Sequence, residues 1–204
     1  AKSLILSLEA AGKKVFPDSN TAWHFDDKLA QKYLLEAIGA PFVPTWVFYN
    51  KVEALNWAES IEYPIVYKLR CGASSQNVKL IRTYKQARKI ISVAFGRGHL
   101  VYDAKESLRE RFRKYRLGKT NAKDVLKGLI RIVYPPDYAW MKSREKGYVY
   151  FQKFVPYNDH DIRVIVIGNK AFAIKRMVRE GDFRASGSGN ILYIFLLNFF
   201  NDIF

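Results

Sequence analysis

Cysteine and histidine are scarce in this sequence of 204 residues: Cys71 is the only cysteine, and there are three histidines. A single cysteine excludes a disulfide framework and a multi-cysteine metal site. His24, His99 and His160 are scattered and none stands near Cys71, so the sequence indicates no nucleophile–base pair. We interpret His160 beside Asp159 as a surface pair and not as a general base.

Targeting signals and long apolar runs are also missing. The sequence has no signal peptide and no apolar run long enough to span a bilayer, so we expect a cytoplasmic location and no membrane partner. The apolar segment 191–204 is interrupted by Asn198, Asn201 and Asp202 and predicts a buried strand or helix. Because the chain starts at Ala1 and not at Met, and stops in this segment, we expect that both ends are cut from something larger or are left after the removal of disordered parts.

Positive charge, in contrast, is abundant. The formal net charge is +15, and the 49% of apolar residues suffice for the core of one large domain or two small ones. Residues 105–146 hold 13 Lys or Arg against 5 Asp or Glu, a net charge of +8. Leu108, Phe112 and Tyr115 recur there at helical spacing, which predicts an amphipathic helix with a basic outer face. Three interpretations stay open: a solvated surface helix, a lid or groove for an anionic substrate, and, without any recognised motif, a nucleic-acid surface.

Apolar periodicity and turn residues predict alternating helices and strands. We expect helices at residues 2–11, 26–38, 52–60, 84–95 (after Thr83 as N-cap) and 122–133. We expect strands at 14–16, 46–48, 64–68, from 78 onward, and at 148–154, 162–167 and 171–176, with a turn at Gly168-Asn169. Helices and strands, then basic helices, then an antiparallel meander predict an α+β fold with several sheets.

The clearest functional signal lies between Pro64 and Ile81. An apolar run ends on Lys68, a loop of small and polar residues follows at 71–77, and a second β-type run opens at Val78. Small side chains let backbone N–H groups approach phosphate oxygens, and the lysine adds a fixed positive charge. The loop is neither a Walker A loop nor a Rossmann fingerprint. It points to a nucleotide-using enzyme, with a hairpin that has a Ser/Asn-rich turn as the plainer alternative.

Four motifs follow one another over about residues 20 to 190. They are Asp27-Lys28 with Gly39-Ala40-Pro41-Phe42-Val43-Pro44-Thr45; Pro64-Ile65-Val66-Tyr67-Lys68 with the loop 72–78; Gln152-Lys153-Phe154-Val155-Pro156; and Asp161-Ile162-Arg163-Val164 with Gly168, Lys175-Arg176 and Phe183-Arg184-Ala185-Ser186. Together they resemble the ATP-grasp superfamily, in the branch of glutathione synthetase and the ribosomal-protein glutamate ligases. The resemblance implies an ATP-grasp fold in which two α+β subdomains clamp a nucleotide between antiparallel sheets.

The resemblance also implies a division of the chain. Residues 1–20 would be the remnant of a preceding domain, and 21–100 the small lid subdomain with the phosphate loop. Residues 101–146 would be a basic helical insertion, and 147–204 a truncated larger subdomain.

The resemblance further implies a set of site residues. The nucleotide would be bound by Lys28, Lys68, Gly72, Ser74, Ser75, Asn77, Gln152, Lys153, Phe154, Val155 and Asp161. Within this set both lysines would meet the triphosphate, the backbone of about Lys153 and Val155 would meet adenine, and Asp161 would accept hydrogen bonds from the ribose. Arg163, Arg176 and Arg184 would neutralise charge on the γ-phosphate as catalytic residues. The plainer alternatives are surface roles for the lysines and Asp161, and core positions for Phe154 and Ile65, which are otherwise candidate adenine walls.

The implied reaction is ATP-dependent carboxylate activation through an acylphosphate, which an amine, a thiol or another nucleophile then attacks. The implied cofactors are ATP and Mg²⁺, and the partners are an unknown carboxylate and an anionic acceptor at the basic insertion. The family binds magnesium with late Asp, Glu and Glu-x-Asn residues, whereas residues 190–204 contain only Asp202, so no metal ligand is assigned. A non-catalytic nucleotide-binding module and a basic nucleic-acid-binding domain stay open as alternatives.

Overall fold

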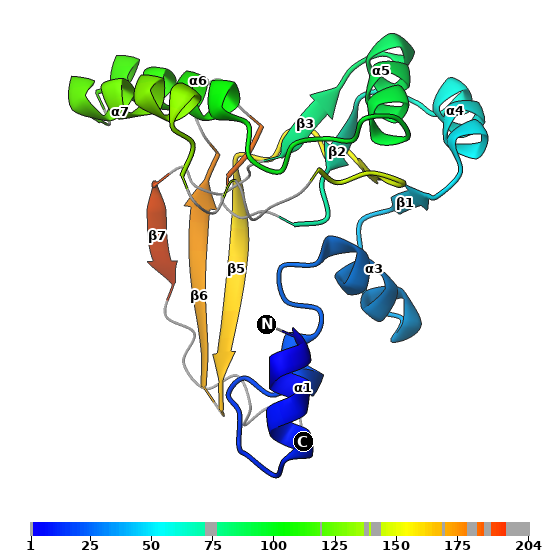
Figure 1. Ribbon diagram of the computed structural model, residues 1–204, viewed down its shortest axis with the longest axis vertical. Helices are drawn as coiled ribbons and strands as arrows, with labels where there is room; N and C mark the ends of the chain where they lie inside the picture. Colours follow the sequence, from blue (N-terminus) through cyan, green and yellow to red (C-terminus); the bar gives the residue numbers. More distant parts are fainter. Residues whose placement is uncertain are drawn as a thin grey trace. The chain divides into compact units, whose positions relative to one another are not determined.

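The computed structural model describes residues 2–71, 77–118, 120–136, 139, 144–168, 170–178, 183–185 and 189–194. In chain order the elements are α1 (Lys2–Ala10), α2 (Ser19–Ala22), α3 (Lys28–Ala37), β1 (Thr45–Phe48), α4 (Lys51–Ser60), β2 (Ile65–Lys68), β3 (Val78–Ile81), α5 (Tyr84–Ala94), α6 (Ala104–Arg116), α7 (Ala122–Val133), β4 (Val149–Lys153), β5 (His160–Ile167), β6 (Lys170–Met177) and β7 (Ile191–Ile194) (Figure 1). They form two compact units, one with the described residues before Phe154 and one with those from Phe154 onward. The predicted mixed α+β composition is confirmed.

Helices α3 to α7 all begin at a side chain that suits a helix N-terminus. Each N-cap side chain accepts a hydrogen bond from a backbone N–H of the first turn, which otherwise has no partner in the helix. These residues are Asp27, Asn50, Thr83, Asp103 and Asn121. The predicted cap at Thr83 is confirmed, because its side chain accepts from the N–H of Gln86.

Two local predictions are wrong. Residues 14–16 form no strand, and Pro17 directly after them offers no N–H to a neighbouring strand. The side chain of Phe16 is exposed, so no burial favours an extended conformation there. Residues 191–194 do form a strand, but its side chains are exposed and not buried. Residues 195–204 and Asn169 of the predicted turn lie outside the described residues.

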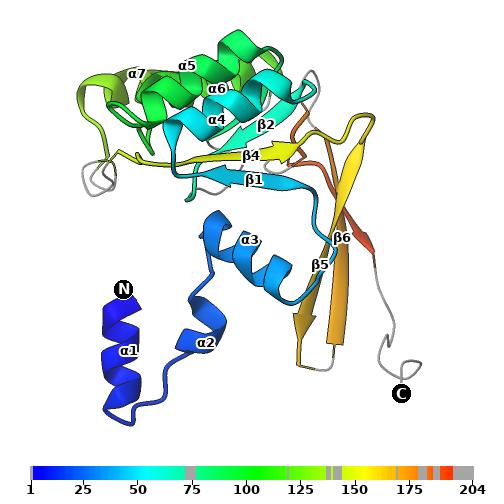
Figure 2. The same cartoon turned by 90° about the vertical axis from the view of Figure 1, so that its right-hand side faces the viewer.

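The first unit is built on a four-stranded antiparallel sheet with the order β1-β4-β2-β3. The register places Tyr67 opposite Phe151 and Lys68 opposite Tyr150. Successive residues of a strand point to opposite faces. Tyr67 therefore enters the core beneath α4 and α5, whereas Lys68 projects from the other face. Helices α4 and α5 lie on the first side of this sheet and α3 lies on the second (Figure 2).

The main core fills the space between this sheet and helices α4 and α5. Its largest fully buried side chains are those of Tyr67, Phe151, Ile65, Ile91 and Val149. Trp57 of α4 stacks on Phe151 with ring centroids 5.3 Å apart. Ile65, a candidate wall for adenine, thus lies in the core. A smaller cluster on the opposite face joins Leu29 of α3 to Tyr148 and Tyr150.

Helices α6 and α7 pack against each other as a helical hairpin (Figure 1). Arg111 of α6 forms an ion pair with Asp124 of α7 and lies over Gly128, where a Cβ would come within 2.8 Å of the Arg111 Cδ. Most of the large apolar residues of α7 are exposed. The exposed ones are Leu126, Leu129, Ile130, Ile132 and Val133.

The second unit contains an antiparallel sheet with the order β5-β6-β7. Its register places Asp161 opposite Arg176 and Arg163 opposite Ile174. Directly opposed residues share a face, so Asp161, Arg163 and Arg176 project from the same side of this sheet.

None of the helices in the described ranges combines the length and apolar character needed to cross a membrane.

Candidate functional site

Lys28 and Lys68 reach one region of the first unit from different elements. Lys28 is the first residue of α3 and Lys68 is the last residue of β2. The backbone N–H of Lys28 donates a hydrogen bond of 3.0 Å to the carbonyl oxygen of Arg70, and the Lys28 ammonium lies 3.5 Å from the same oxygen. The start of α3 is thereby joined to the chain two residues after Lys68. The structure brings the two predicted phosphate-binding lysines together.

The electrostatics of these lysines favour an anion. Burial and, to a smaller extent, the positive charge of Lys28 together lower the pKa of Lys68 to about 8. Burial also lowers the pKa of Lys28, although the charges of Asp26, Cys71 and Glu145 oppose this effect. Both shifts mean that the ammonium groups have lost favourable interactions with water. A bound anion would replace the lost interactions with water by ion pairs with the two ammonium groups.

A directed chain of hydrogen bonds holds Lys68 across three strands. The Lys68 ammonium donates to the Gln152 Oε1 on β4 at 2.5 Å, and the Gln152 Nε2 donates to the Thr45 hydroxyl on β1 at 3.0 Å. The Thr45 hydroxyl in turn donates to the carbonyl oxygen of Val43 at 2.7 Å. An ammonium group has three N–H donors, so this chain fixes Lys68 with only one of them. Gln152, predicted to bind nucleotide, thus positions the lysine in the structure.

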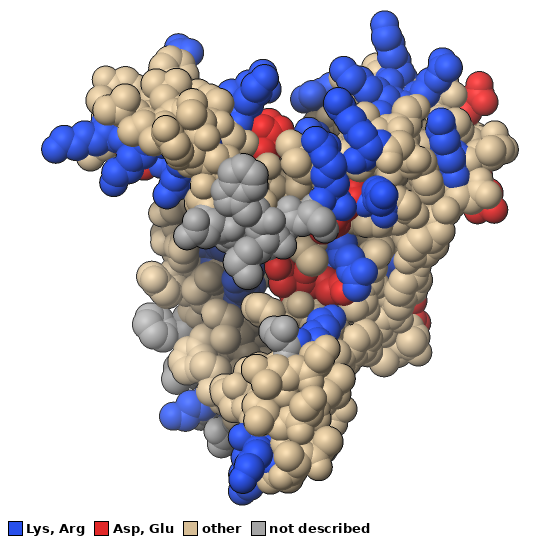
Figure 3. Space-filling view, in the orientation of Figure 1, with Lys and Arg blue, Asp and Glu red and all other residues tan. Residues whose placement is uncertain are grey.

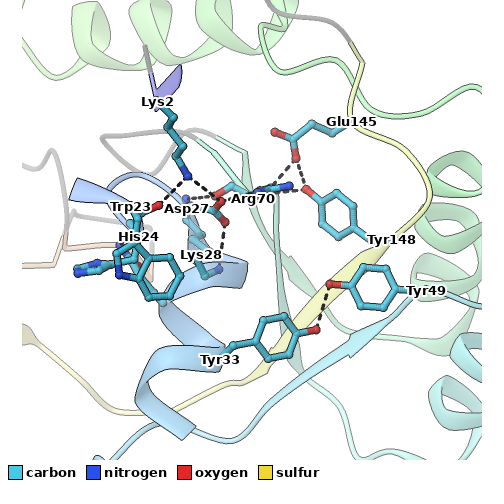
Figure 4. Close-up of polar contacts among 12 residues, drawn as sticks. Lys2, Trp23, His24, Asp27, Lys28, Tyr33, Tyr49, Arg70, Glu145 and Tyr148 are labelled. Carbon is cyan, nitrogen blue, oxygen red and sulfur yellow. Dashed lines mark hydrogen bonds and ion pairs between the residues drawn. The ribbon is translucent and has the colours of Figure 1, made fainter. Parts of the chain in front are cut away.

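Arg70 makes an ion pair that no sequence pattern had indicated (Figure 4). Its Nε and Nη2 donate to the Asp27 Oδ2 at 2.9 and 2.6 Å, while the Asp27 Oδ1 accepts from the N–H of Ala30 at 3.1 Å. Asp27 is only 4% exposed. Burial alone would raise the pKa of Asp27, but the hydrogen bonds from Arg70 and Ala30 outweigh it and lower the pKa. Asp27 was readable in the sequence only as the start of a helix.

The backbone N–H of Arg70 contacts a second pair of side chains. It donates to the Tyr148 hydroxyl at 2.7 Å and to the Glu145 Oε2 at 3.1 Å, and the Tyr148 hydroxyl also donates to Glu145. Burial and this bond to Glu145 raise the pKa of Tyr148. Glu145 and Tyr148 lie shortly before β4, far from Arg70 in sequence, so only the folded chain reveals this contact.

The predicted loop residues are described only in part. Gly72, Ser74 and Ser75 lie outside the described residues. Asn77 has a positive φ of 63°, a conformation that asparagine tolerates better than most residues, and its Nδ2 donates to the carbonyl oxygen of Val101 at 2.8 Å. The Asn77 side chain therefore fixes the point where the chain enters β3.

The division between the two units falls within the predicted hinge, directly after Lys153. The Lys153 N–H donates to the carbonyl oxygen of Pro44 at 2.9 Å, which extends the pairing of β1 with β4. In the second unit the ring of Phe154 meets that of Phe183 edge to face, and the side chain of Val155 is exposed. The predicted contacts of the hinge with adenine stay predictions.

Two of the second unit's predicted site residues bind each other. The Arg176 Nε and Nη2 donate to the two carboxylate oxygens of Asp161 at 2.6 and 2.7 Å, a bidentate ion pair. Arg163 is exposed on the same sheet face. The structure thus brings Asp161, Arg163 and Arg176 together, whereas Arg184 is half-buried and lies outside the strands.

The described residues offer no ligand set for magnesium. They contain no group of three or more His, Cys, Asp or Glu side chains that could hold a metal ion. Asp202 lies outside the described residues. We therefore assign no ligand to Mg²⁺ and no step that passes through it.

Similarity to known proteins is found at the level of structure. No protein-family model and no curated protein matches the sequence. A RimK domain ATP-grasp protein from Sphaerobacter thermophilus DSM 20745 is similar with a TM-score of 0.50 and 18% identity, over 86% of this chain and 50% of that chain. D-alanine–D-alanine ligase from Helicobacter pylori has a TM-score of 0.45 and 11% identity, over 97% and 44%. The ATP-grasp ligase PsnB complexed with a minimal precursor has 0.44 and 16%, over 96% and 47%.

The chain has an ATP-grasp fold. The similarity to the Sphaerobacter protein shows this fold and confirms the predicted fold class. The chain spans about half the length of these solved chains.

Proposed function

We propose that this chain is the nucleotide-binding part of an ATP-dependent ligase of the ATP-grasp type. The observation that carries the proposal is the convergence of Lys28 and Lys68, whose positive charges interact on the sheet face opposite the main core. Two cations held by the fold, with the small residues 72–75 following Lys68 closely in the sequence, suit a triphosphate. The chain would contribute mainly positioning and neutralisation of charge.

The proposed reaction couples a carboxylate to an amine or a thiol. A carboxylate oxygen attacks the γ-phosphorus of ATP, the bond to the bridging oxygen breaks, and ADP leaves. The nucleophile then attacks the acyl carbon of the acylphosphate, loses its proton, and inorganic phosphate leaves. In this proposal Asp161 accepts hydrogen bonds from the ribose hydroxyls, and Arg163, Arg176 and Arg184 neutralise the transferred phosphate.

A titration with a fluorescent, non-hydrolysable ATP analogue tests the proposal, and absence of saturable binding would contradict it. A second candidate, a non-catalytic nucleotide-binding module, is favoured by the missing acid cluster in the described ranges. The two candidates agree on binding and differ in turnover. Trapping of an acylphosphate with hydroxylamine in the presence of ATP and a set of carboxylates separates them.

Backbone recognition of adenine is tested by two substitutions at one hinge residue. Val155→Pro deletes the N–H proposed to meet adenine, whereas Val155→Leu keeps it. We expect the proline variant to lose roughly 0.5–1.5 kcal/mol of ATP binding free energy, the value of one hydrogen bond, plus any strain from the ring. Calorimetric titration measures both variants. An equal loss in the leucine variant would rule out a backbone contact.

The basic helices are proposed to attract an anionic acceptor without holding the nucleotide. Lys and Arg side chains gather over α6 and α7 and also over β3 and α5 (Figure 3). On α6, Arg109 pairs with Glu106 and Arg113 with Glu110, and each pair lies within the helix. The Arg109–Glu106 pair is exposed and contributes little, and the surplus of Lys and Arg over Glu on α6 gives the helix a positive field.

Replacing Arg109, Arg113 and Arg116 with glutamine should therefore leave ATP affinity nearly unchanged. The same triple variant should bind a polyanion such as polyglutamate more weakly and with a shallower dependence on salt. A calorimetric ATP titration decides: a loss of about tenfold or more, about 1.4 kcal/mol, with the circular dichroism spectrum intact, would place these arginines in the nucleotide site. Steep salt dependence of binding to random duplex DNA would instead favour nucleic acid.

A further inference from the structure

Arg70 joins the start of α3, which carries Lys28, to the chain just after β2, which carries Lys68. Its guanidinium binds Asp27, and its carbonyl oxygen accepts from the N–H of Lys28, the next residue (Figure 4). In the chain Arg70 follows Lys68 by two positions. We infer that Arg70 is a positioning residue for nucleotide binding, which holds the Lys28 ammonium beside that of Lys68. This inference rests on the proposed function.

The contact with Asp27 fixes where helix α3 begins. Asp27 is buried, caps the helix through the N–H of Ala30, and binds Arg70 with its other carboxylate oxygen. The Lys2 ammonium lies 3.9 Å from the same carboxylate oxygen but is largely exposed, so Arg70 is the closer cationic partner of the buried Asp27, and losing it would be costly. Since Lys28 is the first residue of the helix, holding Asp27 also sets the place from which the Lys28 side chain extends.

The backbone of Arg70 ties the same assembly to the neighbouring strand. Its N–H donates to the Tyr148 hydroxyl and to Glu145, just before β4. Strand β4 carries Gln152, which accepts the hydrogen bond from Lys68. One arginine therefore links the start of α3 with the end of β2, which carries Lys68, and with the segment before β4, so a displacement of Arg70 would change the spacing of the two ammonium groups.

The alternative is that the Arg70 guanidinium binds the nucleotide itself. Its Nε and Nη2 already donate to Asp27, which fixes the direction of the guanidinium plane and leaves only its remaining N–H groups for a second anion. The geometry therefore favours an indirect role. The two roles differ in one measurable respect. If Arg70 acts only by positioning Lys28, changing Arg70 should have no effect on ATP affinity once Lys28 has been replaced by alanine.

The test is a double-mutant cycle on affinity for the fluorescent ATP analogue. Arg70→Lys keeps the positive charge but removes the planar guanidinium, which donates to Asp27 from two nitrogens. Asp27→Asn keeps the helix cap but removes the ion pair with Arg70. We expect each change to weaken binding by about tenfold, and to have no further effect in a Lys28→Ala background. Arg82→Lys is the matched control, since Arg82 is exposed after β3, and it should bind normally.

Each outcome has a distinct meaning. Additive losses in the Lys28→Ala background would overturn the inference, because Arg70 would then affect nucleotide binding independently of Lys28. Normal binding by both Arg70→Lys and Asp27→Asn, with Lys28→Ala impaired, would overturn the inference and leave the proposed function intact. Normal binding by Lys28→Ala would overturn both. If Arg70→Lys fails to fold by circular dichroism, Asp27→Asn completes the cycle.

A second measurement needs no nucleotide. The charge of Lys28 lowers the pKa of Lys68, so displacement of Lys28 should raise it. The pH dependence of Lys68 acetylation, followed by mass spectrometry, should therefore shift upward in Arg70→Lys and Lys28→Ala but not in Arg82→Lys. An unshifted profile in Arg70→Lys, with a shift in Lys28→Ala, would show that Arg70 does not hold Lys28 in place.

Discussion

Lys68→Ala should weaken ATP binding by roughly 1.5–3 kcal/mol, the value of a hydrogen bond to a charged group, which is more than about tenfold in affinity. Lys68 ends β2 on the sheet face beside α3 and keeps N–H donors for a phosphate. Lys79→Ala is the matched control, because Lys79 is exposed on the paired strand β3, opposite Tyr67 and not on the Lys68 face. Titration of the fluorescent analogue compares them. Equal affinities of the two variants would overturn the site assignment.

The proposed contact between the Lys68 ammonium and a phosphate should also be visible in the pH dependence of ATP binding. With a pKa of about 8, Lys68 is mostly charged at pH 7 and mostly neutral above pH 9. A cation that binds phosphate works only when protonated, so ATP affinity should fall as the pH rises through about 8. The ATP affinity of the Lys68→Ala variant should not decrease with pH in this range, whereas that of the Lys79→Ala variant should.

Phe151→Ala should lower the free energy of unfolding by about 3–5 kcal/mol. Phe151 is 0% exposed in the central strand β4, and its ring lies between Trp57 and Tyr67. Removing the ring leaves a cavity in a core where both neighbours are held by the sheet and by α4, so the site cannot close around it. Urea denaturation followed by tryptophan fluorescence measures the change.

Phe112→Ala is the control for this second result. Phe112 is 51% exposed on α6, so the same change of side chain should cost less than about 1 kcal/mol there. A loss for Phe151→Ala no larger than that for Phe112→Ala would mean that the sheet does not pack against α4 as described.

Much of the fold was predictable because its signals are local. The helices α4, α5 and α7 begin within one residue of their predicted starts, since Asn50, Thr83 and Asn121 cap them with their own side chains. The order of the strands was not predictable, because β4 inserts between β1 and β2 from a distant part of the sequence. Residues 14–16 have residue types that suit a strand, but they pair with no neighbouring strand among the described residues. Whether a segment finds a strand to pair with depends on the fold of the whole chain.

The candidate site shows the same limit. Lys68 was readable from its place at the end of an apolar run, and Lys28 from the motif at the start of α3. Arg70 was not, because its importance depends on Asp27, Glu145 and Tyr148, which approach it only in the folded chain. Polar networks between distant segments leave no periodic pattern in a sequence.

The exposed apolar row on α7 has a consequence for the colloidal behaviour of the chain. Leu126, Leu129, Ile130 and Val133 offer other copies a surface to adhere to, while the Lys and Arg side chains of the hairpin repel those copies. Salt weakens the repulsion, whose range is about 10 Å at 0.1 M and about 3 Å at 1 M, but it leaves the attraction between apolar surfaces in place. We therefore expect that a rise in ionic strength lowers the concentration at which this chain self-associates.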